Sequence, residues 1–302
     1  MSHYHIHNNT EVHVSKNLFI SFILNILITT VEIIGGIVSN SVALLSDSFH
    51  NLSDSAALLI AFFANRVSGK KSTYKRTFGY KRIEILAAFI NSLVLIVICI
   101  FLFIEAYRRF INPEPIKGGL MLVVAIIGLI ANFISILLLK RDSQQNINIK
   151  AAYLHLLGDT FSSIAVIVGA ILIYYFGILW IDAIISFIIG IYIIKETISI
   201  LKQAIDILMQ SVPEGIDLFL IKRELEKING IINIHHIHIW SLDDRSIYFE
   251  CHIDLDKDYR ITELEGIRQN IMKQLKDIYN IEHITLQFEY GGCCKNEIIA
   301  EG

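Results

Sequence analysis

Two His–Asp pairs lie within long apolar stretches of the chain. His50 and Asp54 are four residues apart, and so are His155 and Asp159. At this spacing the two members of a pair lie on one face of a helix, about one turn apart. An unpaired charge in a bilayer is costly, so such residues turn inward and mark an ion path. Two imidazole nitrogens and two carboxylate oxygens form a tetrahedral set that zinc accepts, which predicts an intramembrane metal site.

A competing interpretation is that each pair is a hydrogen-bonded lock between two helices. A single pair would favour the lock, whereas two pairs in otherwise apolar segments favour the metal site. Asp47 lies on nearly the same face as His50 and Asp54. It is either a gate or outer partner of the site or a cap of its own helix, and both alternatives stay open. Glu32 lies among small residues, which favours a packed, partnered carboxylate over a ligand.

Six apolar runs must position these residues in a membrane. The chain has 302 residues, of which 54% are hydrophobic and 18% charged, and its mean hydropathy is +0.55. A soluble domain would be less apolar and nearer a quarter charged. The net charge of −3 gives no sign of a nucleic-acid partner. Since about 20 apolar residues cross a bilayer, the runs predict six transmembrane helices, roughly at 17–38, 41–65, 82–107, 118–139, 151–176 and 180–202.

Basic residues set the orientation of these spans. Lys and Arg gather in the loops after the second and fourth spans, whereas the first and third hairpins are essentially without them. By the positive-inside rule, these loops and both termini are cytoplasmic, which predicts a multi-pass protein surrounded by lipid in the cell membrane. The four cysteines lack the spacing of a disulfide framework, in agreement with a reducing compartment for the tail.

Polarity divides the chain into three parts. Residues 1–15 form a polar, His-bearing cytoplasmic leader without the features of a signal peptide. Residues 16–211 hold the spans, and residues 212–302 read as a cytoplasmic domain that ends in a flexible, Cys-containing tail. In that domain the pattern is helical at 216–229 and 261–279 and strand-like at 233–241, 246–255 and 282–289. The αββαβ order predicts a small α+β, ferredoxin-like fold.

Motifs in four parts of the chain resemble those of the cation diffusion facilitators. In the family's order, they match the signature of the second span, the start of the third, the pair in the fifth and the first strand of the cytoplasmic domain. The residues that carry the resemblance are Ser39–Asp47 with His50 and Asp54, Phe78–Glu84, His155 with Asp159, and His238-Ile239-Trp240.

The resemblance implies a homodimeric antiporter that exchanges metal for protons by alternating access. The mixed His–Asp set is similar to that of the zinc-preferring branch, with Cd²⁺ and Co²⁺ as further substrates. The cytoplasmic domain should then be metallochaperone-like. Two departures matter: the loop 66–81 has no histidine, so the loop metal site of some members should be missing, and the loop 140–150 lacks the His-rich insert of many eukaryotic relatives.

A second metal site is expected in the cytoplasmic domain. Alternation places His252 on the polar face of one strand and His283 with Glu289 on the polar face of the last, so these side chains should meet. The family pattern adds His235. Strict alternation instead groups His235 with the isoleucines of its strand. We nevertheless prefer His235 as a ligand, because the alternation of faces is least strict at the start of a strand. The competing interpretation is an ordinary polar sheet face.

The two ends of the chain carry further candidate ligands. They are the thiols of Cys293 and Cys294 and the leader histidines His3, His5, His7 and His13. Thiolate is a good zinc ligand, and both ends are expected on the cytoplasmic side, where an exporter would collect metal. A short His-bearing leader is also compatible with plain solvation.

These features predict an exporter that exchanges Zn²⁺ for protons and catalyses no reaction. Protons compete with metal for imidazole, and a histidine with a pKa of about 6.5 is suited to that exchange near neutral pH. The alternatives are a membrane metalloenzyme or a metal sensor that uses the same His/Asp set. The chain has no H-E-x-x-H motif, and only His50 and His155 lie within spans. A sensor would need no polar route, whereas both pairs lie deep in spans.

Overall fold

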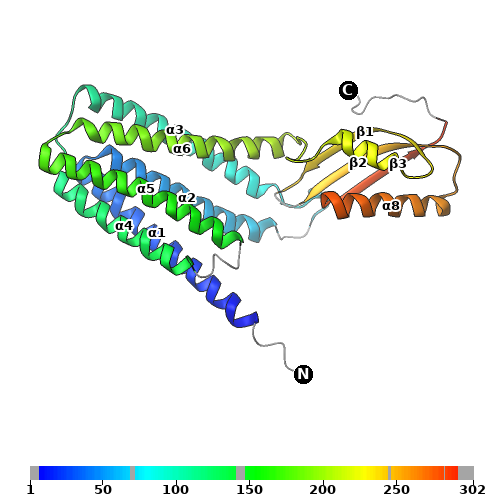
Figure 1. The fold of residues 1–302 in the computed structure, drawn as a ribbon, viewed down its shortest axis with the longest axis horizontal. Coiled ribbons are helices and arrows are strands. Elements are labelled where there is room, and N and C mark those ends of the chain that lie inside the picture. Colours follow the sequence, from blue (N-terminus) through cyan, green and yellow to red (C-terminus); the bar gives the residue numbers. More distant parts are fainter. Residues whose placement is uncertain (1–6, 69–71, 141–146, 244–245, 282, 292–302) are drawn as a thin grey trace. The chain divides into compact units, whose positions relative to one another are not determined.

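The computed structural model describes residues 7–68, 72–140, 147–243, 246–281 and 283–291. Within its helices, the side chains of residues 7–19, 58, 61–66, 68, 147–152 and 155 lie outside the description. Six long helices are followed by a mixed segment of strands and helices (Figure 1). Contacts divide the chain into two compact units, Met1–Phe62 with Ile90–Ile200, and Phe63–Phe89 with Leu201–Gly302.

Long helices account for the first two-thirds of the chain. They are α1 (His7–Ser39), α2 (Val42–Ser68), α3 (Ile83–Ile111), α4 (Gly118–Lys140), α5 (Ile147–Phe176) and α6 (Trp180–Leu208). Among the described residues, five of the six are long and apolar enough to cross a membrane, and α2 is the exception. The described side chains of α2 are unbroken only over residues 42–57, fewer than a span needs, and this part carries Asp47, His50 and Asp54. The helices lie over the six predicted spans: α2 and α3 begin one residue after the predicted starts, and α1, α5 and α6 extend several residues beyond one predicted end.

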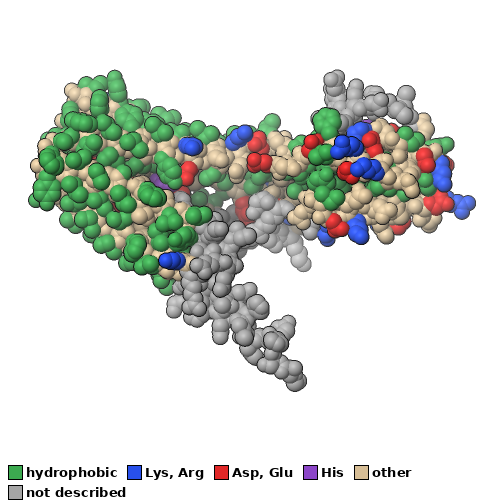
Figure 2. All heavy atoms as spheres, in the orientation of Figure 1, with side chains coloured by type: hydrophobic (Ala, Val, Ile, Leu, Met, Phe, Trp, Pro, Cys, Tyr) green, Lys and Arg blue, Asp and Glu red, His purple; other side chains and the backbone are tan. Residues whose placement is uncertain are grey.

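Close helix packing in the first unit depends on small residues. α4 packs along α1 and α5, and α3 lies beside α6, where the rings of Phe103 and Phe187 stack with centroids 5.4 Å apart (Figure 1). A Cβ atom at Gly35 of α1 would lie 2.7 Å from Val124 of α4, so only glycine permits this approach. Figure 2 shows hydrophobic side chains over most of the visible face of these helices, as expected for a surface in contact with lipid.

The turn between α1 and α2 is fixed by groups from outside it. Asn40 has a φ of 61°, in the left-handed region that asparagine tolerates. The Arg109 guanidinium at the end of α3 donates to the Asn40 carbonyl and, at 2.8 Å, to its side-chain oxygen. The Lys117 N–H donates to the Ser39 carbonyl at 2.9 Å. A tight hairpin therefore joins α1 to α2, and α3 with the segment after it holds this hairpin in place.

The C-terminal domain follows the predicted αββαβ order. Its elements are α7 (Leu218–Leu225), β1 (Ile231–Ser241), β2 (Ile247–Leu255), α8 (Ile261–Tyr279) and β3 (His283–Glu289). The sheet order is β1-β2-β3, with β1 antiparallel and β3 parallel to β2. A parallel neighbour needs a crossover connection, and α8 supplies it. Figure 2 shows Lys, Arg, Asp and Glu side chains gathered over this domain.

The core of this domain lies between α8 and the sheet. Ile267, Ile271 and Leu275 repeat at helical spacing on the buried side of α8 and pack with Phe249 and Ile253 of β2. The helix boundaries have local causes. Asp217 caps α7 by accepting the Phe219 and Leu220 N–H groups at 2.8 and 3.3 Å, and α8 ends where Asn280 adopts a φ of 55°.

The segment before α3 belongs to the same unit as this domain. The Phe78 and Tyr248 rings meet edge to face at 5.5 Å. Lys81 Nζ lies 3.3 Å from Ser246 Oγ and 3.9 Å from an Asp243 carboxylate oxygen, at the turn between β1 and β2. These contacts explain why residues 63–89 cluster with the C-terminal domain and not with the remaining helices.

Cys251 is a core residue of this domain and should resist thiol reagents. Burial, and secondarily the Glu250 carboxylate, raise the pKa of its thiol to about 12. The neutral thiol is therefore favoured in the folded state, and this contribution to stability is present below pH 9 and lost as pH rises toward about 12. In a variant with Cys293 and Cys294 replaced by serine, we expect maleimide labelling of Cys251 at pH 8 only after denaturation. Rapid labelling of the folded protein would contradict this packing.

Candidate metal centres

The His50 ring on α2 lies between two carboxylates. It is 3% exposed. Its Nδ1 is 3.5 Å from Asp54 Oδ2, one turn along the same helix, and its Nε2 is 3.4 Å from Asp159 Oδ1 on α5. Two atoms bound at about 2.0–2.1 Å to one tetrahedral zinc lie about 3.3–3.4 Å apart. The separation between Nε2 and Asp159 therefore fits one edge of a zinc coordination sphere.

The two carboxylates face different nitrogens of the ring. An ion at Nε2 leaves Nδ1 to carry the ring proton, and Asp54 is then the acceptor that fixes this tautomer. Direct ligation by Asp54 as well would need a rotation of the ring or of the Asp54 side chain. His155, the remaining predicted ligand, lies in α5 one turn before Asp159, and its side chain lies outside the described residues.

Asp47 connects α2 to α5. It is 1% exposed, and its two oxygens accept from Ser162 Oγ and, at 3.4 Å, from Ser163 Oγ. Ser162 Oγ also lies 2.8 Å from the Asp159 carbonyl oxygen, so the link reaches the backbone of a predicted ligand. The alternative that Asp47 caps its own helix is wrong, because Asp182 and Ser41 accept the first N–H groups of α2.

Asp182 of α6 caps α2 across the bundle. Asp182 is 1% exposed and accepts from Ser41 Oγ at 2.6 Å and from the Val42 and Ala43 N–H groups at 2.8 and 3.3 Å. Ser41 Oγ in turn accepts from the Leu44 N–H at 3.1 Å. Sequence analysis missed this residue. Its only local signal is an acidic side chain in the first turn of an apolar helix, and that signal names no partner.

Glu32 of α1 is the packed, partnered carboxylate that the sequence predicts. It is 1% exposed, and its Oε2 accepts from Asn51 Nδ2 of α2 at 3.1 Å. Gly128 of α4 faces its other oxygen so closely that a Cβ atom there would overlap Oε1. Glu32 of α1 thus contacts both α2 and α4, and its partner Asn51 directly follows His50 in the chain.

A second group of possible ligands lies on the sheet of the C-terminal domain. His235, His252 and Glu289 each offer an atom within 4.8 Å of the other two. They come from neighbouring strands, since His235 pairs with His252 across β1 and β2. Glu289 Oε1 lies 2.7 Å from His252 Nδ1, and Oε2 lies 3.7 Å from His235 Nε2. Two imidazoles and a carboxylate are a ligand set that zinc accepts.

A chain of polar contacts orients His235. Its Nδ1 lies 3.3 Å from Asp254 Oδ2, which accepts from Asn233 Nδ2 at 3.0 Å. Lys222 of α7 donates to Asn233 Oδ1 at 2.5 Å and pairs with Glu226 at 2.8 Å. A carboxylate behind a metal-binding imidazole fixes its tautomer and ring orientation. The sheet therefore supplies the three possible ligands and, in Asp254, a carboxylate that orients His235.

A bulge in β1 explains why strict alternation misplaces His235. The register shifts between His235 and His238, and His236 takes a φ of 52°. The extra residue changes the face on which the preceding side chains lie. The His236 ring stacks on that of His252 with centroids 4.5 Å apart. Partial burial lowers the pKa of His236, with further lowering by His252 and His238, so its neutral form is favoured.

The predicted meeting of His283 with His252 within one chain is wrong. Because β3 runs parallel to β2, Gln287 lies opposite His252, and His283 lies opposite Tyr248 near the other end of the strand. The His283 and Tyr248 ring centroids are 4.3 Å apart. The remaining predicted ligands lie outside the described residues, either entirely or, for His7 and His13, as side chains: His3, His5, His7, His13, Cys293 and Cys294.

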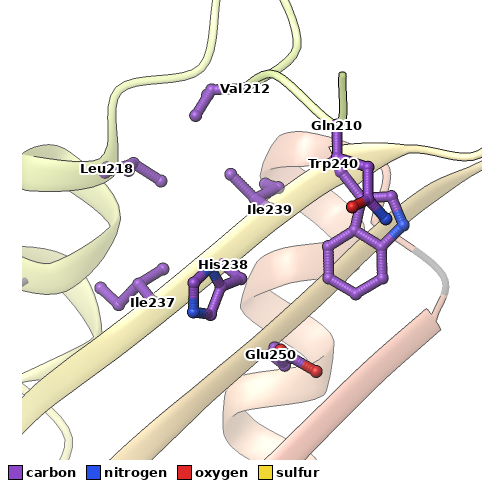
Figure 3. Close-up of a pocket in the computed structure, with 8 residues that line it drawn as sticks. All are labelled: Gln210, Val212, Leu218, Ile237, His238, Ile239, Trp240 and Glu250. Atoms are coloured by element: carbon purple, nitrogen blue, oxygen red, sulfur yellow. The ribbon is translucent and has the colours of Figure 1, made fainter. Parts of the chain in front are cut away.

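A separate pocket lies where the linker after α6 meets β1. Figure 3 shows His238, Ile239 and Trp240 of β1 beside Gln210 and Val212 of the linker. Its lining also holds Glu250, the cross-strand partner of His238. The pocket contains neither His235 nor Glu289 and is distinct from the ligand group described above.

Curated transporters resemble this chain over most of its length, and one solved domain matches a smaller part of it. The Cd, Co and Zn/H(+)-K(+) antiporter of Bacillus subtilis is 41% identical over 94% of this chain and 91% of that protein. The zinc transporter ZitB of Escherichia coli is 34% identical over 97% and 94%. The solved metal-bound C-terminal domain of the CzcD transporter from Cuprividus metallidurans is 27% identical and covers 24% of this chain and 99% of that one, with a TM-score of 0.22.

Two protein families match this chain, and together the matches include nearly all of the described residues. Residues 18–209 match the cation efflux transmembrane domain, which includes all six long helices apart from the first turns of α1. Residues 213–290 match the cytoplasmic domain of cation efflux proteins. The motifs in α2 and α5, the long apolar helices and the α+β domain thus agree with both matches, and the chain belongs to the cation efflux family, the cation diffusion facilitators whose motifs it carries.

Proposed function

We propose that this protein exports Zn²⁺ from the cytoplasm in exchange for protons, with Cd²⁺ and Co²⁺ as further substrates. The observation that carries the proposal is the buried His50 ring between Asp54 and Asp159, which joins α2 to α5. The names of the relatives support the ion range, since they include zinc transporters and an antiporter of cadmium, cobalt and zinc. The matching family and the similar curated proteins are all transporters, so the metalloenzyme alternative has no support.

The transported ion is the substrate, and the residues of the chain provide its site. His50 Nε2 and Asp159 would bind it, His155 would complete the set from one turn away on α5, and Asp54 would either ligate or hold the His50 ring. Two carboxylates offset the charge of a divalent cation. A neutral imidazole binds metal and a protonated one does not, so protons that reach the site displace the ion.

Zinc flux in sealed vesicles tests this function. Purified protein is reconstituted with a zinc-sensitive dye inside, and zinc is added outside with and without an opposed pH gradient. We expect saturable zinc uptake that the opposed gradient accelerates and that cobalt and cadmium inhibit by competition. Zinc binding without flux would favour the metal-sensor alternative instead.

The group on the sheet is proposed as a regulatory zinc site. His235, His252 and Glu289 would bind the ion, and Asp254 would orient His235. The match to the cytoplasmic domain of the family supports a homodimer, and the Lys and Arg distribution supports a cytoplasmic side for both termini. Bound zinc would offset the carboxylates of the domain and bias the spans toward one access state, by coupling and not by carrying cargo.

A paired substitution tests the regulatory site. In the full-length protein carrying Asp159→Asn, to silence the transport site, His252→Ala with Glu289→Ala should remove one class of zinc binding in calorimetry. His283→Ala is the matched control and should retain it, because that histidine lies near the other end of β3. With Asp159 intact, the double variant should retain flux with a partial loss of apparent zinc affinity, since coupling energies are about 1–3 kcal/mol. Equal zinc binding by the double variant and the control would contradict the proposed regulatory site.

A further inference from the structure

Glu32 is a buried carboxylate that the proposed metal site does not use. It is 1% exposed, and its hydrogen-bond partner is the neutral amide of Asn51 at 3.1 Å. Among the described residues, no Lys or Arg forms an ion pair with it. Within the described part of the chain, the charged groups that act on it are Asp47 of α2 and Asp159 of α5, both acidic. From α4, the facing residue is Gly128, which brings no charge.

A carboxylate in these surroundings needs a cation or a proton. A buried charge without a partner is strongly unfavourable in the apolar part of a membrane protein, and two acidic neighbours add repulsion. A proton removes the charge. An alkali ion stripped of water would need more oxygen ligands than Glu32 and Asn51 supply, so the proton fits this site better.

Asn51 can serve both protonation states of Glu32. Its Nδ2 donates to the carboxylate, while its buried Oδ1 has no hydrogen-bond partner among the described residues. A protonated Glu32 has an O–H donor, and a rotation of the Asn51 amide would present Oδ1 to it. The unused acceptor is therefore explained if the carboxyl group binds and releases a proton.

We propose that Glu32 is a proton-binding site of the exchange cycle, separate from the metal ligands. The proposal rests on the proposed zinc–proton exchange. When zinc binds between His50 and Asp159, its positive charge favours release of the Glu32 proton to water, which leaves the carboxylate and the Asn51 N–H as its donor. Proton return restores the neutral acid and weakens zinc binding. By linkage, each ligand lowers the affinity for the other by the same factor.

The substitution Glu32→Gln tests this site in the full-length protein. The glutamine amide keeps the shape of the side chain and donates to Asn51 Oδ1 as the protonated acid would. Zinc titrations are measured by calorimetry in buffers of different ionisation enthalpy, which gives the protons released on binding. We expect the zinc stoichiometry to stay constant while about one proton fewer is released per chain. Glu32→Asp should restore the release, and equal release by Glu32→Gln and the parent protein would overturn the proposal.

Asp182→Asn provides a matched control. Asp182 is an equally buried carboxylate, but three donors hold its charged form, so this change should leave proton release on zinc binding unaltered.

If Glu32→Gln does not fold, infrared difference spectra of the parent protein test the proposal instead. Zinc should remove the signal of a protonated carboxyl group, and Glu32→Asp should shift that signal. No such signal would overturn the proposal. Because these readouts need no flux, they are independent of the vesicle test of zinc export.

Discussion

Replacement of Asp159 by asparagine is expected to abolish zinc flux. The asparagine keeps the shape of the side chain, so the buried contact with α2 can persist, but the neutral amide is a poor zinc ligand and no longer offsets the charge of the ion. Loss of an outer partner alone typically costs 10–100-fold in metal affinity, so loss of a ligand should lower the flux by at least about 100-fold. The measurement is the initial rate of zinc uptake into vesicles that contain equal amounts of folded protein.

Asp54→Asn is the informative comparison for this change. Asp54 faces Nδ1 of His50, the nitrogen opposite the one near Asp159. If Asp54 acts mainly as the acceptor that holds the ring, its amide can still accept that hydrogen bond, and flux should fall by only about tenfold. An Asp159→Asn protein that transports zinc at the parental rate would show that the ion binds elsewhere.

Replacement of His50 by aspartate should turn the metal preference away from zinc. The change removes the one described nitrogen donor of the intramembrane group and adds a third carboxylate. Oxygen-rich sites suit manganese, whereas imidazole suits zinc, so the ratio of manganese to zinc transport should rise by about tenfold or more. Competition between the two ions for uptake into vesicles measures this ratio. The control is His50→Ala, which loses the donor without gaining a carboxylate and should transport neither ion well. An unchanged competition profile for His50→Asp would place selectivity in other residues.

Periodicity in the sequence was sufficient to predict most of the architecture. The long helices follow from continuous apolar runs, and the order of elements in the C-terminal domain follows from the change between helical and alternating patterns. The prediction of Glu32 as a packed carboxylate also agrees with the structure, because the small residues near it are visible in the sequence. These features depend on residues close together along the chain.

Features that depend on distant pairing could not be predicted in this way. The position of His283 depends on β3 running parallel to β2, and alternation gives the faces of a strand but not its direction. The face of His235 depends on one extra residue in β1, which is a property of the backbone. The contact of Asp182 with Ser41 joins residues 141 positions apart. No local pattern contains that information.

The attachment of α2 to α6 through Asp182 restricts how the helices can move during transport. If the first turn of α2 separated from α6, two backbone N–H groups and one hydroxyl would lose their acceptor away from water, at a cost of about 1–3 kcal/mol each. We therefore expect this end of the two helices to serve as a pivot whose contacts survive the whole cycle. On such a pivot, a small rotation of α6 becomes a larger sideways displacement farther along α2, so His50 and Asp54 would travel while Ser41 stays in place.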